Sequence, residues 1–296
     1  MNYRKKIFVI INPVSGTKSK KDIPGYFKSL DNEKFDIQII YTEYPGHATE
    51  IAEKAIKNKA DYMIAVGGDG TINEVAKAMI NSNVVLGIIP VGSGNGLARS
   101  LSIPMNKAKA INIISKGVTR RIDYGTVNNH IFLCTCGVGF DALVSEKSIN
   151  QSKRGKLMYA RNMFDIFRKF NSEKYKIETP TDTFETNAFV VTCANAPQYG
   201  NNAFIAPDAK MDDGYMNIAI IKPLSVLNIP KLAVQMFSKN IGKSRKMVEI
   251  VTPEVTIIRE NEGSMHLDGN AVQAGNEIRI KIVRQGLNVL VPSAVP

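Results

Sequence analysis

The sequence predicts an α/β N-terminal domain with a mostly parallel sheet covered by helices on both faces, followed by an antiparallel, β-rich C-terminal domain. Over the first part of the chain, short apolar runs alternate with helical patterns, which is typical of a parallel sheet. Later, strand-like segments separated by turn residues follow one another, which is typical of antiparallel sheets. We expect the domains to span residues 1–124 and 125–285, with the tail 286–296 packing back on the first.

Apolar runs of strand length and apolar residues at helical spacing define the elements of the first domain. In the helix at 48–56, for example, the apolar residues at helical spacing are Ala48, Ile51, Ala52, Ala55 and Ile56. The expected elements are strands at 7–11, 35–41, 62–66 and 84–89 and helices at 48–56, after Thr71, near 95–102 and at 105–116.

The second domain combines short strands with two basic segments. The strand-rich stretches are 122–138 and 184–221. The basic segments, 147–176 and 222–247, are expected to interrupt the strands as helices. Individual strands are expected at 189–193, 215–221, 255–259 and 277–283, and the first basic helix is expected to carry an apolar face of Ala160, Met163, Phe164, Phe167 and Phe170.

Composition excludes several classes of protein. The chain has 296 residues, 44% of them hydrophobic, which is enough to bury a large core. No apolar run approaches the roughly 18 residues of a membrane-spanning helix. Three cysteines without Cys-x-x-Cys spacing and three histidines disfavour a zinc site or a disulfide framework, and they fit a reducing cytoplasm.

The net charge of +11 is concentrated in the two basic segments. Segment 147–176 holds nine Lys or Arg and two acids, whereas segment 222–247 holds six and none. Two interpretations remain open: solvated helix faces, or a surface that meets anionic phospholipid, where each basic residue contributes about 1 kcal/mol. No nucleic-acid partner is expected, because neither segment matches a recognised binding motif.

Three turns rich in glycine and polar residues follow strands of the predicted parallel sheet, at 12–16, 67–71 and 90–96. Ligands of open parallel sheets bind beyond the carboxyl ends of the strands, and a helix that starts after a turn directs free N–H groups at phosphate. Each turn alone is compatible with an ordinary βα connection, but together they predict a phosphate-binding rim. Neither a Walker A loop nor a dinucleotide fingerprint is present, since Leu97 stands where the latter needs glycine.

Asp69 lies inside the second of these turns. A carboxylate beside phosphate is unfavourable unless a cation or a proton-transfer task accounts for it. The combination of Asp69 with the glycines around it therefore predicts phosphoryl chemistry.

An ordered series of motifs extends over nearly the whole chain and resembles the diacylglycerol kinase catalytic-domain family of bacterial lipid kinases, with sphingosine kinases as relatives and NAD kinases more distantly related. The matching residues are Asn12-Pro13-x-Ser15-Gly16, Thr42, Gly67-Gly68-Asp69-Gly70-Thr71 with Asn73-Glu74, Pro90-x-Gly92-Ser93-x-Asn95-x-x-Ala98-Arg99, Ile122-Asp123-x-Gly125, Gly137-x-Gly139-Phe140-Asp141-Ala142, Asn195-Ala196-x-x-Tyr199-Gly200, Ala206-Pro207-x-Ala209-x-x-Asp212-Asp213-Gly214 and Leu267-Asp268-Gly269.

The resemblance implies a two-domain, ATP-dependent lipid kinase that binds ATP between its domains and phosphorylates a lipid hydroxyl of the diacylglycerol or sphingoid-base class. It also implies a structural Mg²⁺ held by Asp213 with main-chain oxygens near Lys210 and Tyr215, although Asp212-Asp213-Gly214 equally fits a β-turn. The expected nucleotide-binding residues are Asn12, Ser15, Gly16, Thr42, Gly67, Gly68, Asp69, Gly70, Thr71, Asn73, Glu74, Ser93, Gly94 and Asn95.

One position departs from the family pattern. The last motif usually reads Asp-Gly-Glu, with the glutamate as general base, but here it reads Asp268-Gly269-Asn270. We therefore expect Asp69 or Asp268 to accept the proton, directly or through a water. Losing a base that contributes about 10²–10⁴-fold leaves a second hypothesis open, a catalytically weakened nucleotide- or lipid-binding regulator. A kinase of a soluble substrate, as in NAD kinases, is a third.

No catalytic role is assigned to His47, His130 or His266, although His266 stands two residues before Asp268. The expected partners are a lipid substrate at the membrane surface and anionic phospholipid, and a homodimer remains open. We expect a cytoplasmic location with peripheral association at the inner face of the membrane.

Overall fold

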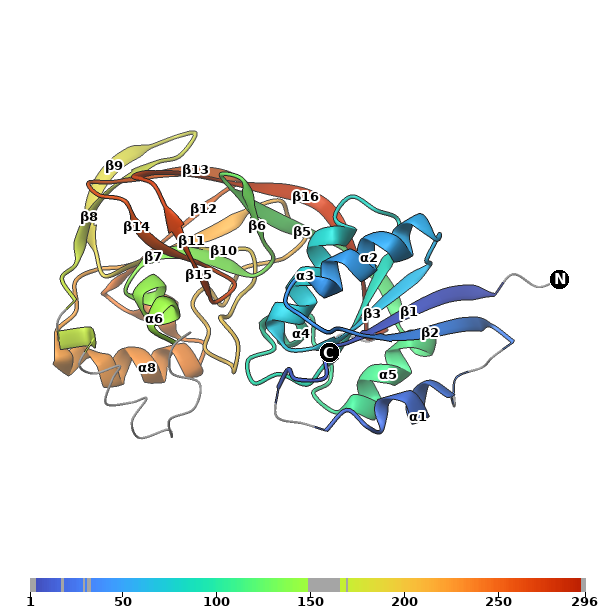
Figure 1. The fold of residues 1–296 in the computed structure, drawn as a ribbon. Helices are drawn as coiled ribbons and strands as arrows, with labels where there is room; N and C mark the ends of the chain where they lie inside the picture. The colour runs from blue at the N-terminus through green and yellow to red at the C-terminus, as the bar shows by residue number, and fades with distance from the viewer. Residues whose placement is uncertain are drawn as a thin grey trace. The chain divides into compact units, whose positions relative to one another are not determined.

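The structure is a computed structural model that describes residues 4–16, 19–28, 30, 33–148, 166–168 and 170–293. The chain divides into two units, which are described separately (Figure 1). Unit 1 comprises Met1–Asp123 and Arg284–Pro296, and unit 2 comprises Tyr124–Val283.

A parallel sheet forms the centre of unit 1, as the sequence predicted. Its strand order is β2-β1-β3-β4, and the end of β16 (Glu277–Val291) pairs in parallel with β4 through Asn288 and Val289. The residues of β1 from Ile7 to Ile11 are buried, because helices cover both faces of such a sheet. The four strands are β1 (Lys5–Ile11), β2 (Phe35–Tyr41), β3 (Tyr62–Gly67) and β4 (Val85–Pro90).

Helices cover this sheet, with α2 and α3 on one side and α1 and α5 on the other (Figure 1). Of the predicted apolar residues of α2, those from Ala48 to Ala55 are buried and Ile56 is partly buried. Helix α1 was not predicted, because it has six residues and buries only Ile23 and Phe27, too few to show a period. The helices are α1 (Ile23–Lys28), α2 (His47–Lys57), α3 (Asp69–Met79), α4 (Gly96–Ser100) and α5 (Lys107–Lys116).

Unit 2 is an antiparallel β sandwich, which confirms the predicted fold class. One sheet has the order β12-β11-β10-β7-β14-β15. Facing it are antiparallel pairs of β13 with β16 and β8, β8 with β9, and β5 with β6. The strands are β5 (Val118–Val127), β6 (His130–Phe132), β7 (Thr135–Gly139), β8 (Glu173–Glu178), β9 (Thr183–Ala188), β10 (Val190–Ala194), β11 (Met216–Ile221), β12 (Met247–Thr252), β13 (Glu254–Arg259), β14 (Gly263–Leu267) and β15 (Asn270–Ala274).

Two apolar cores hold unit 2 together. The first lies between the two sheets and includes Val138 and Val191 from one and Ile257 from the other. The second includes Phe189 and Ile221, with residues of helix α8 packed against them. The helical elements of unit 2 are α6 (Phe140–Ser148), the 3₁₀ turns η1 (Val226–Asn228) and η2 (Ile241–Lys243), and α8 (Ile229–Phe237).

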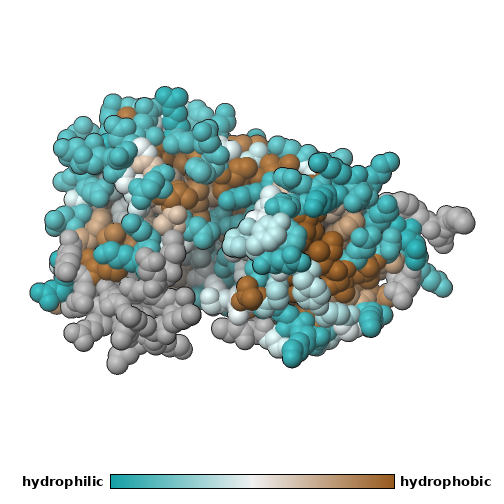
Figure 2. Space-filling view, in the orientation of Figure 1, coloured by the Kyte–Doolittle hydropathy of each residue, from teal (hydrophilic) through white to brown (hydrophobic). Residues whose placement is uncertain are grey.

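The two basic segments differ in outcome. The second contains α8, so its helical prediction is confirmed there. The helical prediction for the first segment is wrong at its end, because residues 173–176 belong to β8. In this strand Tyr175 is buried while Lys174 and Lys176 are exposed. This period of two belongs to a strand, and its hydrophilic face is visible around β8 and β9 in Figure 2.

The predicted apolar face of the first basic segment lies mostly outside the described residues, which include only Phe167 and Phe170 of it. These two rings pack against Phe140 and Phe189, with centroids 5.2–5.8 Å apart. Among the helices that the structure describes, none combines the length and apolar content needed to cross a bilayer.

Candidate functional site

The three predicted turns lie at one edge of the unit 1 sheet, where adjacent parallel strands end. The backbone N–H of Asn12 donates to the carbonyl of Val66 at 3.1 Å, and that of Val91 donates to the carbonyl of Gly67 at 3.0 Å. The turns after β1, β3 and β4 therefore meet, and we call residues 12–16, 67–71 and 90–96 together the rim.

The side chain of Asn12 connects two turns of the rim. Its Oδ1 accepts from the backbone N–H groups of Val14 and Ser15, both at 3.1 Å. Its Nδ2 donates to Oγ1 of Thr71 at 3.1 Å. Asn12 therefore shapes the first turn and attaches it to the start of α3.

Glycines allow the turns of the rim to pack on one another. A Cβ atom on Gly16, which has φ +65°, would lie 2.0 Å from the carbonyl oxygen of Val91, and one on Gly92 would lie 2.5 Å from Cα of Gly68. Neither position tolerates a larger residue. Gly70, in the first turn of α3, differs, because a Cβ atom there would meet nothing within 4 Å.

Asp69 binds the backbone at the start of α4. Its Oδ2 accepts from the N–H of Asn95 at 2.8 Å, and its Oδ1 accepts from the N–H of Gly96 at 2.7 Å. Helix starts carry N–H groups without partners inside the helix. Because the carboxylate of Asp69 accepts from two N–H groups at the start of α4, it has a structural role besides any role with a cation or in proton transfer. Gly94 makes room for it, because a Cβ atom there would lie 2.8 Å from Oδ2.

The remaining predicted nucleotide residues of unit 1 lie in or beside the rim. Thr42 follows β2 and donates its N–H to Ile11 at 2.9 Å, and the carbonyl of Glu74 accepts from Thr49 at 3.1 Å. Asn95 is 3% exposed; its Nδ2 donates to Gly92 at 2.8 Å, and its Oδ1 has no partner among the described residues. Asn73 is buried in α3, and Ser93 lies in the third turn.

Two lysines that the sequence did not single out lie beside the first turn of the rim. Nζ of Lys20 donates to the carbonyls of Pro13 and Ser15. Burial lowers the pKa of Lys20, and the nearby charge of Lys107 lowers it further. Lys107 forms a 2.6 Å ion pair with Asp22. The first turn therefore has a cation bound to its backbone, which favours an anionic ligand.

In unit 2, Asp268 anchors the loop between β6 and β7. Its carboxylate accepts from the N–H groups of Leu133 at 2.8 Å, Cys134 at 2.7 Å and Thr135 at 3.0 Å. Asp268 itself has φ +51° and donates its N–H to the carbonyl of Thr135 at 2.8 Å. This geometry gives Asp268 a structural role, while its role as proton acceptor stays a prediction.

The predicted metal residues lie in the turn that precedes β11. Oδ1 of Asp213 accepts from the N–H of Tyr215 at 3.0 Å, which is the turn geometry that the sequence left open. Mg²⁺ is bound through one or two carboxylates together with carbonyl oxygens and waters, so Asp213 with carbonyls of Lys210 and Tyr215 is a suitable donor set. In the described part of the chain, no group of three or more His, Cys, Asp or Glu residues forms a richer site.

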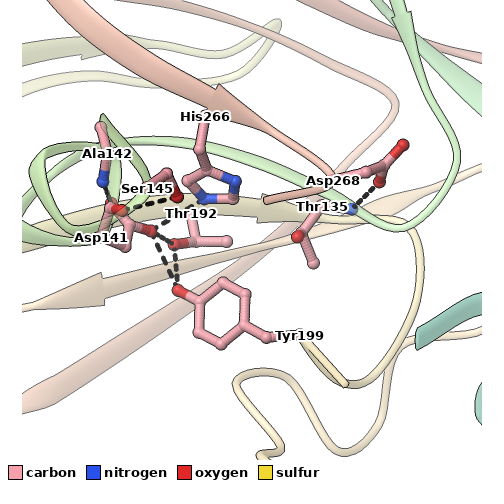
Figure 3. A network of polar contacts seen from close by, with 8 residues as sticks. All are labelled: Thr135, Asp141, Ala142, Ser145, Thr192, Tyr199, His266 and Asp268. Atoms are coloured by element: carbon pink, nitrogen blue, oxygen red, sulfur yellow. Dashed lines mark hydrogen bonds and ion pairs between the residues drawn. The ribbon is translucent and has the colours of Figure 1, made fainter. Parts of the chain in front are cut away.

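A polar network in unit 2 was not predicted as a site (Figure 3). Oδ2 of Asp141, in the first turn of α6, lies 2.9 Å from Nε2 of His266, 2.7 Å from Oγ1 of Thr192 and 3.0 Å from the hydroxyl of Tyr199. The hydroxyls of Thr192 and Tyr199 are 2.7 Å apart. In the neutral tautomer that makes this contact, Nε2 of His266 carries the proton, and its buried Nδ1 has no partner among the described residues.

Glycine again makes the contact geometrically feasible. A Cβ atom on Gly137 would lie 2.9 Å from Nε2 of His266 and 3.0 Å from Oδ2 of Asp141. The motif Gly137-x-Gly139-Phe140-Asp141 therefore carried the signal for this network. Burial first, and the charge of Asp141 second, raise the pKa of Tyr199 well above its usual value, so the phenol remains a neutral donor.

Three residues of this network, Asp141, Tyr199 and His266, line a largely apolar cavity of about 410 Å³ within unit 2. Such a space, with a few converging polar groups, suits a ligand that has an apolar body and one polar end. Its polar residues include Asp141, Tyr199 and His266, and Gly269 of the last motif also lines it. The apolar lining is Phe140, Val144, Phe167, Phe189, Val190, Ile205, Ile221, Leu224, Ile229, Leu232, Ala233 and Met236.

Comparison with known families matches both parts of the chain. Residues 6–127 match the diacylglycerol kinase catalytic domain, and residues 134–291 match the YegS C-terminal NAD kinase beta sandwich-like domain. Together these two matches cover the residues of the rim and those of the unit 2 network.

Individual proteins are similar at modest identity. A diacylglycerol kinase of Staphylococcus epidermidis (strain ATCC 35984 / RP62A) is 27% identical over 90% of this chain and 86% of that protein. One of Staphylococcus saprophyticus is 26% identical over 99% and 97%. Two structures from Bacillus anthracis str. Sterne share the fold, with TM-scores of 0.80 at 24% identity (99% and 97% covered) and 0.75 at 21% identity (100% of both).

Proposed function

We propose that this chain, which belongs to the diacylglycerol kinase catalytic-domain family, transfers the γ-phosphoryl group of ATP to a lipid hydroxyl of the diacylglycerol or sphingoid-base class. The observation that carries this proposal is the largely apolar cavity of unit 2, which Asp141, Tyr199 and His266 also line. It offers an acyl or alkyl chain a dry lining and a hydroxyl a set of hydrogen-bonding partners.

The rim would hold the phosphates of ATP. The first turn of α3 presents free N–H groups, and Lys20 holds a positive charge against the turn at Ser15. Gly70 leaves its side open. Mg²⁺ held by Asp213 with carbonyls of Lys210 and Tyr215 would neutralise charge in unit 2.

The acceptor would bind with its chain along α8 and its hydroxyl toward Asp141. Asp141 accepts three hydrogen bonds at Oδ2, so its orientation is determined before a substrate arrives. A positioned group of this kind contributes to rate by holding the acceptor in place. Phosphoryl transfer depends mainly on positioning and charge neutralisation, which suits a site that lacks the usual glutamate.

Asp69 and Asp268 remain the proposed proton acceptors. Backbone N–H groups already bind both oxygens of each carboxylate. A carboxylate has about four lone-pair sites, so each retains room for a water. We therefore favour a water relay over direct contact with the hydroxyl.

Transfer of ³²P from γ-labelled ATP to a lipid panel tests the proposal. The panel includes diacylglycerol, a sphingoid base and, as a soluble control acceptor, NAD. Labelling of a lipid but not of NAD is expected, because the cavity is mainly apolar. If no lipid is labelled while the protein still binds ATP, the proposed lipid kinase activity is excluded.

The alternative of a weakened regulator depends on Asn270, which is exposed at the start of β15. Asn270→Glu restores the family residue, and Asn270→Gln has the same length without the charge. If base catalysis limits turnover, Asn270→Glu raises kcat by up to about 10²–10⁴-fold and Asn270→Gln does not. Equal rates for the wild type and both variants would refute the weakened-regulator hypothesis.

We further propose a cytoplasmic protein that binds the inner face of the membrane, because its acceptor resides there. Anionic phospholipid would be its second partner. Homodimerisation stays a proposal that sedimentation analysis can test.

A further inference from the structure

Exposed large apolar side chains gather on η1 and α8. Leu227 is 88% exposed, Val234 67% and Phe237 61%. Three such side chains within eleven residues are a local concentration rather than the scattered single residues that need no explanation.

Helix α8 is apolar over a wide arc, of which one part lines the cavity and a neighbouring part is exposed. Ile229, Leu232 and Met236 follow the spacing i, i+3, i+7 and line the cavity of unit 2. Pro230, Val234 and Phe237 follow i, i+4, i+7 and are exposed. We call Leu227, Pro230, Val234 and Phe237 the α8 outer face. Exposed apolar residues that gather in one place mark an interaction surface, so the outer face calls for a partner.

The segment that carries this face is basic. Segment 222–247 contains six Lys or Arg and no acid. In the described part of the chain none of the six forms an ion pair with an acid. Lys239 lies over the ring of Phe204 at 4.7 Å and Lys246 donates to the carbonyl of Pro223 at 3.2 Å. A solvated helix face would explain the cations but not the 88% exposure of Leu227.

We propose that the α8 outer face docks on an anionic phospholipid surface, with Leu227, Val234 and Phe237 in the interface and the surrounding lysines over the head groups. A short amphipathic helix rich in basic residues binds membranes in this way. An exposed apolar face in a segment whose Lys and Arg residues form no ion pair with an acid in the described part of the chain complements anionic lipid, which supplies both an apolar layer and negative charge.

The proposal rests on the proposed function in one respect. The inner face of α8 lines the cavity, so docking would bring a wall of the acceptor site to the lipid surface. The binding itself does not depend on catalysis and is measured without ATP.

A fluorescent reporter tests the orientation directly, because the chain contains no tryptophan. Val234→Trp places a single probe on the α8 outer face. Val118→Trp is the matched control, since Val118 is 49% exposed on β5. With phosphatidylcholine vesicles that contain phosphatidylglycerol, the emission of Val234→Trp shifts to the blue and that of Val118→Trp does not. No shift at position 234, or equal shifts at both, overturns the proposal.

Vesicle flotation measures the contribution of charge and apolar contact. Lys231→Gln is expected to weaken binding to phosphatidylglycerol vesicles about five-fold, the effect of one basic residue near the surface, and Val234→Ser weakens it as well. Lys57→Gln on α2 and Val118→Ser are the matched controls and leave binding unchanged. High salt weakens binding of the wild type. If Lys231→Gln and Val234→Ser both bind the vesicles as tightly as the wild type, docking is contradicted.

Two lipid acceptors distinguish a failure of the docking proposal from a failure of the kinase proposal. The double variant Lys231→Gln, Val234→Ser should lose activity on vesicle-embedded diacylglycerol but keep activity on a water-soluble short-chain analogue. If neither the wild type nor the double variant labels either acceptor, while vesicle binding follows the expected pattern, the kinase proposal fails and the docking proposal stands. If Val234→Ser alters the sedimenting mass and not vesicle binding, the face joins two copies of the chain and docking is overturned.

Discussion

The carboxylate of Asp69 accepts a hydrogen bond from the backbone N–H of Gly96 at 2.7 Å. A second bond, from Asn95 at 2.8 Å, binds its other oxygen. Helix α4 has only five residues, too few to be stable by itself, so this contact joins the turn after β3 to the helix after β4. The rim is therefore a preassembled part of unit 1.

Replacing Gly70 by alanine separates ligand binding from stability. A Cβ atom there meets no protein atom within 4 Å, and alanine stabilises a helix by about 0.5–1 kcal/mol relative to glycine. Gly70→Ala should keep or raise the melting temperature but weaken ATP binding, because the methyl group projects from the first turn of α3. Gly25→Ala, also without a neighbour within 4 Å, is the control. Titration with a fluorescent ATP analogue and thermal unfolding report the two effects, and unchanged ATP affinity would argue against phosphate at this turn.

Asp268→Asn distinguishes an anchor from a proton acceptor. An amide offers one acceptor oxygen, whereas the carboxylate accepts three N–H bonds from residues 133–135. We expect the free energy of unfolding to fall by about 1–3 kcal/mol, because at least one buried N–H loses its partner. Urea denaturation measures this, with Asp208→Asn, an exposed site, as control. Lost turnover with unchanged stability would instead identify Asp268 as a purely catalytic group.

Ala233→Phe tests the use of the cavity in unit 2. Ala233 lines the cavity of about 410 Å³, and a phenyl ring there takes up space that an acyl chain would occupy. The KM for a long-chain diacylglycerol should rise at least about ten-fold, the lower end of the effect of one methylene in an apolar pocket. The KM for ATP serves as the internal control. A variant with unchanged KM for both substrates would place the acceptor outside this cavity.

Tyr199 makes stability depend on alkaline pH. Burial and the charge of Asp141 raise the pKa of its phenol in the folded protein. In the unfolded chain the pKa of the phenol is about 10. The stabilisation is present below about pH 10 and declines above it, because only the unfolded state then releases the proton. The difference in unfolding free energy between the wild type and Tyr199→Phe should therefore narrow as the pH rises above 10. A constant gap between the wild type and Tyr199→Phe over this pH range would contradict the shift.

Local patterns predicted most of unit 1. The apolar runs of β1, β3 and β4 and the glycine turns after them are contiguous in sequence, so their type and order follow from short-range rules. Helix α1 was not predicted, because six residues do not reveal a period. The strand β8 was predicted as helix, because its charges dominated a segment in which Tyr175 and Ile177 alternate with lysines.

What the sequence by itself determined was the fold class, the family and the turns of the rim, since each is encoded in residues a few positions apart. Only the tertiary structure decided what those residues contact. His266 and Asp141 are 125 positions apart and meet at 2.9 Å, and Asp69 accepts hydrogen bonds from the backbone at the start of α4. Such pairings depend on strand order and on the space that glycines such as Gly137 leave open, and no local pattern records them.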